Sequence, residues 1–177
     1  SLAWCKRLLD LGSALPVDLR NQSLGWRLTN ALSLADPTAA LACTDDIIRL
    51  MTPEEGTQLL QQTIGDLINA GQQALAGPLI AHLSDAAGKV PAYRQLAVLL
   101  NMRRALATCD WAHYTDAFNA CVAQLPDAAL FPLTRQIYSS LLKNNRKDLV
   151  QQSSRLIVFS AGDTTNSVNL AARLCAE

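Results

Sequence analysis

Apolar residues recur every three or four positions along most of the chain, which is the spacing of one buried face of an α-helix. Short breaks rich in Pro, Gly, Asp and Asn interrupt the pattern, and almost nothing in the chain reads as a strand. The segments between the breaks pair into units of roughly 35 to 38 residues, a size typical of helical repeats. We therefore predict an all-α fold: a right-handed stack of about four antiparallel helical hairpins (an alpha-solenoid) plus terminal helices. The breaks fall at Asp36-Pro37, Thr52-Pro53, Gly71, Val90-Pro91, Cys109-Asp110, Pro126-Asp127, Asn144-Asn145 and Gly162-Asp163.

The first complete hairpin is predicted over residues 17–35 and 37–51. Its first helix has an apolar stripe that ends with Ala35. Asp36 and Pro37 then supply an N-cap and a first-turn proline for the second helix. An earlier apolar pattern ends at Gly12, and we expect it to be the second half of an incomplete hairpin.

The second hairpin has the clearest start in the chain. Thr52 is a favourable N-cap, Pro53 suits the first helical position, and Glu55 completes a capping box three residues after the cap. Its partner helix contains Gly77-Pro78, which predicts either a kink or a late start near Pro78.

Two further pairs and a last helix complete the prediction. Pro91 begins the third pair, and Asp110 caps its second helix. The fourth pair is predicted from about residue 132 to 143 and from about 146 to 161, and a last helix follows Asp163. No linker divides the chain, so we expect residues 1–177 to form a single helical-repeat domain that is a segment of a longer protein.

Two segments, residues 107–126 and 145–150, resemble the turn and second helix of tetratricopeptide repeats. With the closing proline of that family placed on Pro126, Phe118 falls on its large apolar site and Cys121 on a small site. Met102 stands where the family has glycine and Tyr114 where it has a small residue, so a different right-handed helical-hairpin family is the alternative.

The resemblance implies that the first helix of each pair lines a concave groove that holds a peptide or helix of a protein partner. We expect the groove on the second to fourth pairs. Because Leu99, Leu100 and Leu106 fill the buried face of the third pair's first helix, Arg103 is predicted to point out of the core and to bind a carboxylate of the partner. The predicted partner-binding residues are Asn101, Arg103, Gln136 and Lys143.

Charge and hydropathy narrow the class of partner. The formal net charge is +0, which argues against nucleic acid as a partner. Residues 1–90 carry six basic and nine acidic residues, and residues 91–177 carry nine basic and six acidic residues, so the chain has a mild charge asymmetry. The longest purely apolar run, Leu96–Leu100, is too short to cross a membrane, and we expect no membrane insertion.

Few residues have the spacing of a catalytic or metal site. Cys109 and His113, with Asp110, Asp116 and Cys121 nearby, could in principle ligate zinc or form a nucleophile and base. No close ligand pair or recognised catalytic motif accompanies them, so we predict no metal, no cofactor and no catalytic residue. The five cysteines are widely spaced in apolar stretches, which favours reduced thiols in a cytoplasmic protein.

We therefore interpret the chain as a non-enzymatic protein–protein interaction or regulatory module, a scaffold of bacterial type judged from its Ala, Leu and Gln usage. Two alternatives are left open. One is a secretion-system chaperone or the ligand-sensing region of a bacterial transcription regulator, and the other is a small helical enzyme that uses Cys109, His113 and Asp116.

Overall fold

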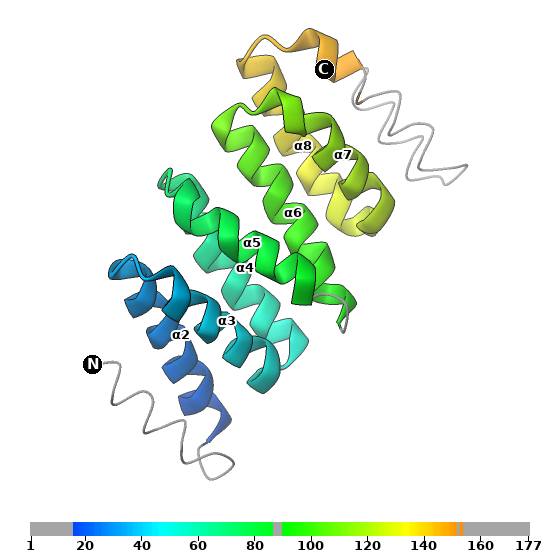
Figure 1. Cartoon of the computed structure of the whole chain (residues 1–177). Coiled ribbons are helices and arrows are strands. Elements are labelled where there is room, and N and C mark those ends of the chain that lie inside the picture. Colours follow the sequence, from blue (N-terminus) through cyan, green and yellow to red (C-terminus); the bar gives the residue numbers. More distant parts are fainter. Residues whose placement is uncertain (1–15, 87–89, 152, 154–177) are drawn as a thin grey trace. The chain divides into compact units, whose positions relative to one another are not determined.

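The computed structural model describes residues 16–86, 90–151 and 153, which lie in helices, in the turns between them, or directly before a helix (Figure 1). No strand occurs among these residues, which confirms the all-α prediction. The expected helices before Gly12 and after Asp163 lie outside the described residues. The helices with both ends described are α2 (Val17–Ser33), α3 (Pro37–Leu50), α4 (Pro53–Asn69), α5 (Gln73–Ala86), α6 (Pro91–Thr108), α7 (Trp111–Gln124) and α8 (Asp127–Lys143).

Long and short helices alternate along the described chain. The helices that the sequence assigns as the first of each pair, α2, α4, α6 and α8, have 17, 17, 18 and 17 residues. The second helices, α3, α5 and α7, have 14 residues each. Consecutive first helices begin 36, 38 and 36 residues apart, close to the period that the hydrophobic pattern predicts.

The turn after each first helix has the same backbone conformation. One residue in each turn has a positive φ: Ala35 at 50°, Gly71 at 73°, Cys109 at 52° and Asn145 at 55°. In every case the N–H of the following residue donates to the carbonyl five positions earlier, as from Asp36 to Ala31 and from Gln72 to Leu67. This pairing is the Schellman motif, which satisfies the last carbonyls of a helix and reverses the chain.

Side-chain caps fix the helix starts that the sequence predicts. The Asp36 carboxylate accepts from the backbone N–H of Ala39 at 2.9 Å, and the Thr52 hydroxyl accepts from the N–H of Glu55 at 3.3 Å. Asp110 caps α7 in the same way. Ala35 differs from its prediction, because it is exposed and forms the left-handed turn residue instead of ending the buried stripe.

Two helices begin earlier than their prolines suggest. α5 begins at Gln73 and includes Pro78, and α8 begins at Asp127 and includes residue 132. A proline inside a helix removes one backbone hydrogen bond and costs about 3 kcal/mol. In α5, burial of Ala76, Leu79 and Ile80 offsets that cost, because tertiary packing can outweigh local propensity.

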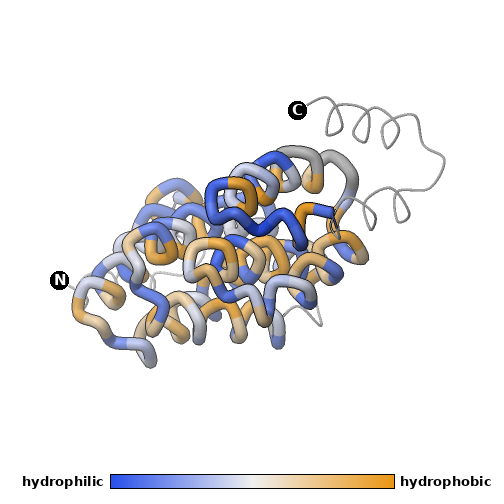
Figure 2. Tube along the Cα trace, turned by 90° about the horizontal axis from the view of Figure 1, so that it is seen from above, coloured by the Kyte–Doolittle hydropathy of each residue, from blue (hydrophilic) through white to orange (hydrophobic). Residues whose placement is uncertain are grey.

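The described residues belong to two compact units, residues 1–100 and 101–177, whose boundary falls within α6. In the first unit α2 packs against α3, α4 packs against α5, and α3 also contacts α4 and α5. Hydrophobic and hydrophilic residues alternate around the helical turns, as Figure 2 shows. The apolar faces of these helices form one core, whose most buried large residues include Leu24, Leu28, Ile47, Leu60, Ile64, Leu79, Ile80 and Leu83.

Aromatic residues organise the core of the second unit. Tyr114 and Phe118 of α7 are buried, and their rings stack with centroids 6.0 Å apart. The Tyr114 hydroxyl lies 2.7 Å from the Ser153 hydroxyl in a buried hydrogen bond. The guanidinium of Arg146 lies 5.2 Å from the ring centroid of Trp111, a cation–π contact. These contacts join α7 to the chain segment that follows α8.

Candidate partner-binding groove

An open groove with a volume of about 720 Å³ lies between α2, α4 and the start of α5 in the first unit. Helices α2 and α4 are the first helices of the first two pairs. The sequence predicts a groove on the first helices of the second to fourth pairs, whereas this groove lies on those of the first and second pairs. Its lining residues are Thr29, Leu32, Ser33, Ala35, Leu59, Gln62, Thr63, Asp66, Leu67, Gln72, Ala74 and Leu75.

The groove combines leucine side chains with short polar groups. The Thr29 hydroxyl donates to the Gly25 carbonyl at 3.0 Å, and the Ser33 hydroxyl donates to the Thr29 carbonyl at 2.8 Å. Because both hydroxyl protons are used within α2, the oxygens of these side chains are left to act as acceptors toward a ligand. Asp66 is the one ionisable residue among the lining residues. The lining can thus contact an apolar group and a hydrogen-bond donor at once.

An exposed stripe on α2 continues the groove wall beyond its lining residues. Trp26, Thr29 and Ser33 are spaced by three and four residues, so they share one face of the helix. The stripe extends in the opposite direction to Leu19, which lies seven residues, or two helical turns, before Trp26. Trp26 is 54% exposed and Leu19 is 50% exposed, which makes them two of the few large apolar side chains on the described surface.

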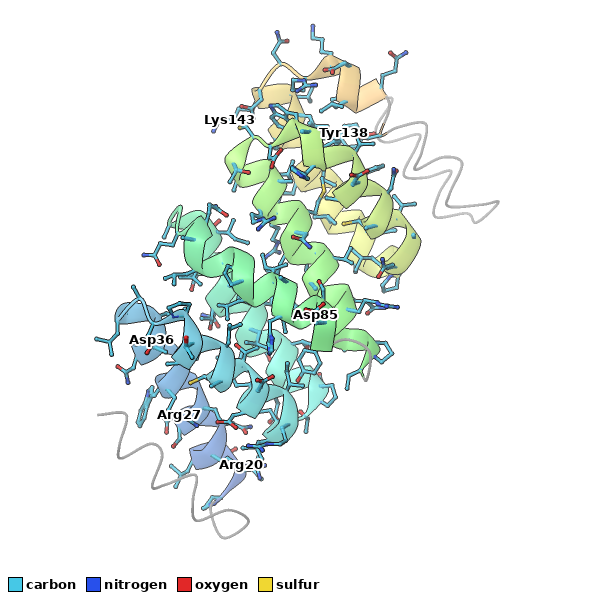
Figure 3. The ribbon with its side chains drawn as sticks, in the orientation of Figure 1. Arg20, Arg27, Asp36, Asp85, Tyr138 and Lys143 are labelled. Carbon is cyan, nitrogen blue, oxygen red and sulfur yellow. The ribbon has the colours of Figure 1, made fainter. Side chains whose placement is uncertain are left out.

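An ion pair and a hydrogen bond between side chains link the helices of the first unit outside the groove. Arg27 projects from α2 (Figure 3), and its guanidinium lies 2.8 Å from the Asp46 carboxylate of α3. The ring of His82 in α5 lies 2.7 Å from the carboxylate of Asp45 in α3. None of these residues lines the groove. These contacts link α3 to α2 and α5, and their charged groups do not contribute to the lining of the groove.

The four predicted partner-binding residues all belong to the second unit. Gln136 and Lys143 are exposed on α8, and Asn101 is half-buried on α6. Arg103 is also half-buried, and its Nε is buried without a hydrogen-bond partner among the described residues. The prediction that Arg103 points out of the core is therefore met only in part, because packing encloses the inner end of its guanidinium.

Each of these four residues occupies the same helix position as a lining residue of the groove in the first unit. Positions are counted back from the left-handed turn residue of each pair. Arg103 precedes Cys109 by six residues, as Thr29 precedes Ala35. Lys143 and Ser33 each lie two residues before their turn residue. Asn101 and Thr63 each lie eight residues before theirs, and Gln136 and Gln62 each lie nine residues before theirs.

Cys109 and His113 do not converge on a reaction centre. The Cys109 thiol lies 3.6 Å from the side-chain oxygen of Asn144, and the His113 ring lies 2.8 Å from the Asp110 carboxylate that caps its own helix. The hydrogen bond from His113 lowers the pKa of Asp110. Burial raises the pKa of the Cys121 thiol to about 12, so this thiol stays protonated at neutral pH. Within the described ranges, no group of three or more His, Cys, Asp or Glu residues could hold a metal ion.

The sequence prediction missed Trp26 and Asp66. A signal for Trp26 was present: once Leu24, Leu28 and Ala31 are assigned to the core, Leu19 and Trp26 are left on a different face of the same helix. Asp66 carried no such signal, because exposed acids are common on helices.

No protein-family model, no curated protein and no solved structure matches the chain. Among the described helices, none is long and apolar enough to cross a membrane.

Proposed function

We propose that this chain is a non-enzymatic helical-repeat module that binds a segment of a partner protein in the groove formed by α2, α4 and the start of α5. The observation that carries the proposal is that this open groove lies on the first helices of consecutive hairpins. An open, extended surface of this kind suits a polypeptide segment better than a small substrate, which proteins usually enclose.

The proposed architecture is a right-handed stack of about four tetratricopeptide-like hairpins. Its support is the recurrence of the same left-handed turn at residues 35, 71, 109 and 145. The matching positions of Thr29 and Arg103, and of Ser33 and Lys143, support a partner-binding role for the same helix face in both units. Burial of Cys43 and Cys121 supports a reducing cytoplasmic location, because buried cysteines in such proteins act as small apolar residues.

Site-specific photocrosslinking in living cells tests the proposal. A photoreactive phenylalanine analogue replaces Gln62, which is exposed and lines the groove, and in a second variant it replaces Ala42, which is exposed on α3 outside the groove. We expect a discrete crosslinked partner from position 62 and none from position 42. A partner that crosslinks from position 42 alone, or equally from both, would place the binding surface elsewhere.

A further inference from the structure

The exposed tryptophan of α2 is the strongest sign of what the groove binds. Trp26 leaves 54% of its surface in contact with solvent, whereas Leu24 and Leu28 on the other face of the same helix are fully buried. Large aromatic residues that stay exposed next to a hollow are enriched at the centres of protein interfaces, because they supply much apolar area with little side-chain entropy to lose. Trp26 is therefore positioned to cover an apolar side chain of a partner.

Trp26 and the groove form one continuous surface along α2. Thr29 lines the groove and lies three residues after Trp26, so their side chains are neighbours on the helix surface. Leu32 of α2 and Leu59 of α4 also line the groove. An amphipathic helix or extended segment seated here would place successive apolar side chains against these leucines and against Trp26.

Asp66 gives this surface its charge. It is exposed, it makes no ion pair with any described residue, and it lies four residues after Gln62 on the groove side of α4. The equivalent position of the next pair, five residues before its turn residue, is Arg104. The negative charge is therefore a property of the groove in the first unit and is not shared by every hairpin.

Resting on the proposed function, we infer that the groove of the first unit binds an amphipathic segment of a partner protein that packs an apolar side chain on Trp26 and places a lysine or arginine beside Asp66. The apolar contact supplies most of the affinity, and the ion pair sets the preference for a basic segment over an acidic one. Trp26 and Asp66 thus have separate roles, and a substitution at each residue tests its role separately.

Two synthetic amphipathic peptides test the inference on the full chain. They share a leucine face and differ only in carrying Lys or Glu on the flanking positions. We expect the Lys peptide to bind more tightly and to shift the NMR signal of the Trp26 indole N–H, assigned with Trp26→Phe. The dissociation constant of the Lys peptide should rise about two- to fivefold in Asp66→Asn, and it should rise further in Asp66→Lys.

Matched controls separate the local effect from the overall charge and hydrophobicity of the chain. Asp85→Asn removes an exposed acid near the far end of α5, away from the groove (Figure 3), and should leave binding unchanged. Trp26→Ala should weaken binding about tenfold, whereas Leu142→Ala, at a side chain that is 58% exposed in the second unit, should not. Circular dichroism checks that each variant is folded.

Three results would overturn the inference: no binding of the Lys peptide, equal affinity for both peptides, or equal effects of Asp66→Asn and Asp85→Asn. The crosslinking experiment distinguishes this failure from failure of the proposed function. If a partner crosslinks from position 62 but the peptides show no charge preference, the groove is still the binding site and only the basic segment is rejected. If no partner crosslinks from position 62, both proposals fail.

Discussion

Single turn residues set the local stability of the hairpins. Ala35 has a φ of 50°, a conformation in which a β-carbon costs about 1–2 kcal/mol and glycine has no such cost. Ala35→Gly should therefore raise the free energy of unfolding, by about 1 kcal/mol after the greater flexibility of glycine in the unfolded chain is included. Urea denaturation followed by circular dichroism measures the change.

Replacing alanine by glycine within a helix should have the opposite effect on the free energy of unfolding. Ala42→Gly, at an exposed position of α3, should lower the free energy of unfolding by about 1 kcal/mol. Gly71→Ala should also be destabilising, because Gly71 has a φ of 73°. Equal effects of Ala35→Gly and Ala42→Gly would contradict the assignment of residue 35 to the left-handed turn.

A close contact between Gly56 and Tyr93 predicts strong coupling between the two residues. A β-carbon at position 56 would lie 2.4 Å from the Tyr93 hydroxyl oxygen. Gly56→Ala should therefore cost about 1–3 kcal/mol in the wild-type chain. In a Tyr93→Phe background the hydroxyl is absent, and the same substitution should be neutral or stabilising because alanine favours the helix.

Tyr93→Phe alone should be tolerated. The Tyr93 hydroxyl is buried without a hydrogen-bond partner among the described residues, and burial raises the pKa of Tyr93. Removing an unpaired buried hydroxyl loses no bond and should change the free energy of unfolding by less than about 1 kcal/mol. A double-mutant cycle from four urea denaturation curves tests this, and an equal cost of Gly56→Ala in both backgrounds would rule out the contact.

At the scale of a helix, the cap of α7 predicts a pH dependence of stability. Asp110 accepts hydrogen bonds from the backbone N–H of His113 at 3.3 Å and from its ring at 2.8 Å. The bond to the His113 side chain is the main cause of the lowered pKa of Asp110 in the folded chain. The stabilisation by this carboxylate is therefore fully present above its unfolded pKa and is lost as the pH falls through the lowered folded pKa.

Asp110→Asn keeps a cap oxygen but removes the titration. We expect the wild-type chain to be more stable than this variant near neutral pH, and we expect the difference to shrink as the pH falls from about 6 to about 3. Asp116→Asn, at an exposed acid of the same helix that caps nothing, is the control. A difference that stays constant over this range would show that the Asp110 charge does not stabilise the helix start.

At the scale of the whole molecule, the reactivity of the cysteines measures how well each unit excludes solvent. Cys43 is 2% exposed in the first unit, Cys121 is 0% exposed in the second unit, and Cys109 is exposed at a turn. In a chain with Cys5 and Cys175 changed to serine, an alkylating reagent should label Cys109 first. Cys43 and Cys121 should react only when the unit that contains each of them opens.

Pulsed alkylation at increasing urea concentrations, read by mass spectrometry of the peptides, measures this order. The high pKa of Cys121, which burial raises to about 12, reinforces its slow reaction in the folded state. Labelling of Cys121 as fast as Cys109 without urea would contradict its burial. Adding Cys109→Ser to the chain that already lacks Cys5 and Cys175 provides the baseline, because the two remaining thiols are the buried ones.

The sequence alone determined the all-α fold class and most helix starts, because these depend on atoms close together in the chain. The caps Asp36, Thr52 and Asp110 each bond a backbone N–H three residues ahead, so a local pattern is sufficient to find them. For the complementary reason, Pro132 predicted too late a start for α8, and Pro78 left a late start of α5 open beside a kinked helix. Their helices begin five residues earlier, and local propensity does not include the packing that favours those turns.

The tertiary structure alone decided which polar positions line the groove. The groove takes its lining from α2, α4 and α5, and residues such as Thr29 and Asp66 lie far apart in the sequence. The hydrophobic period identifies the face of a helix that is buried, but it does not say which exposed faces of two helices stand beside one another. For the same reason the sequence could not foresee that packing buries the Nε of Arg103, since the burial of a long side chain depends on its neighbours in space.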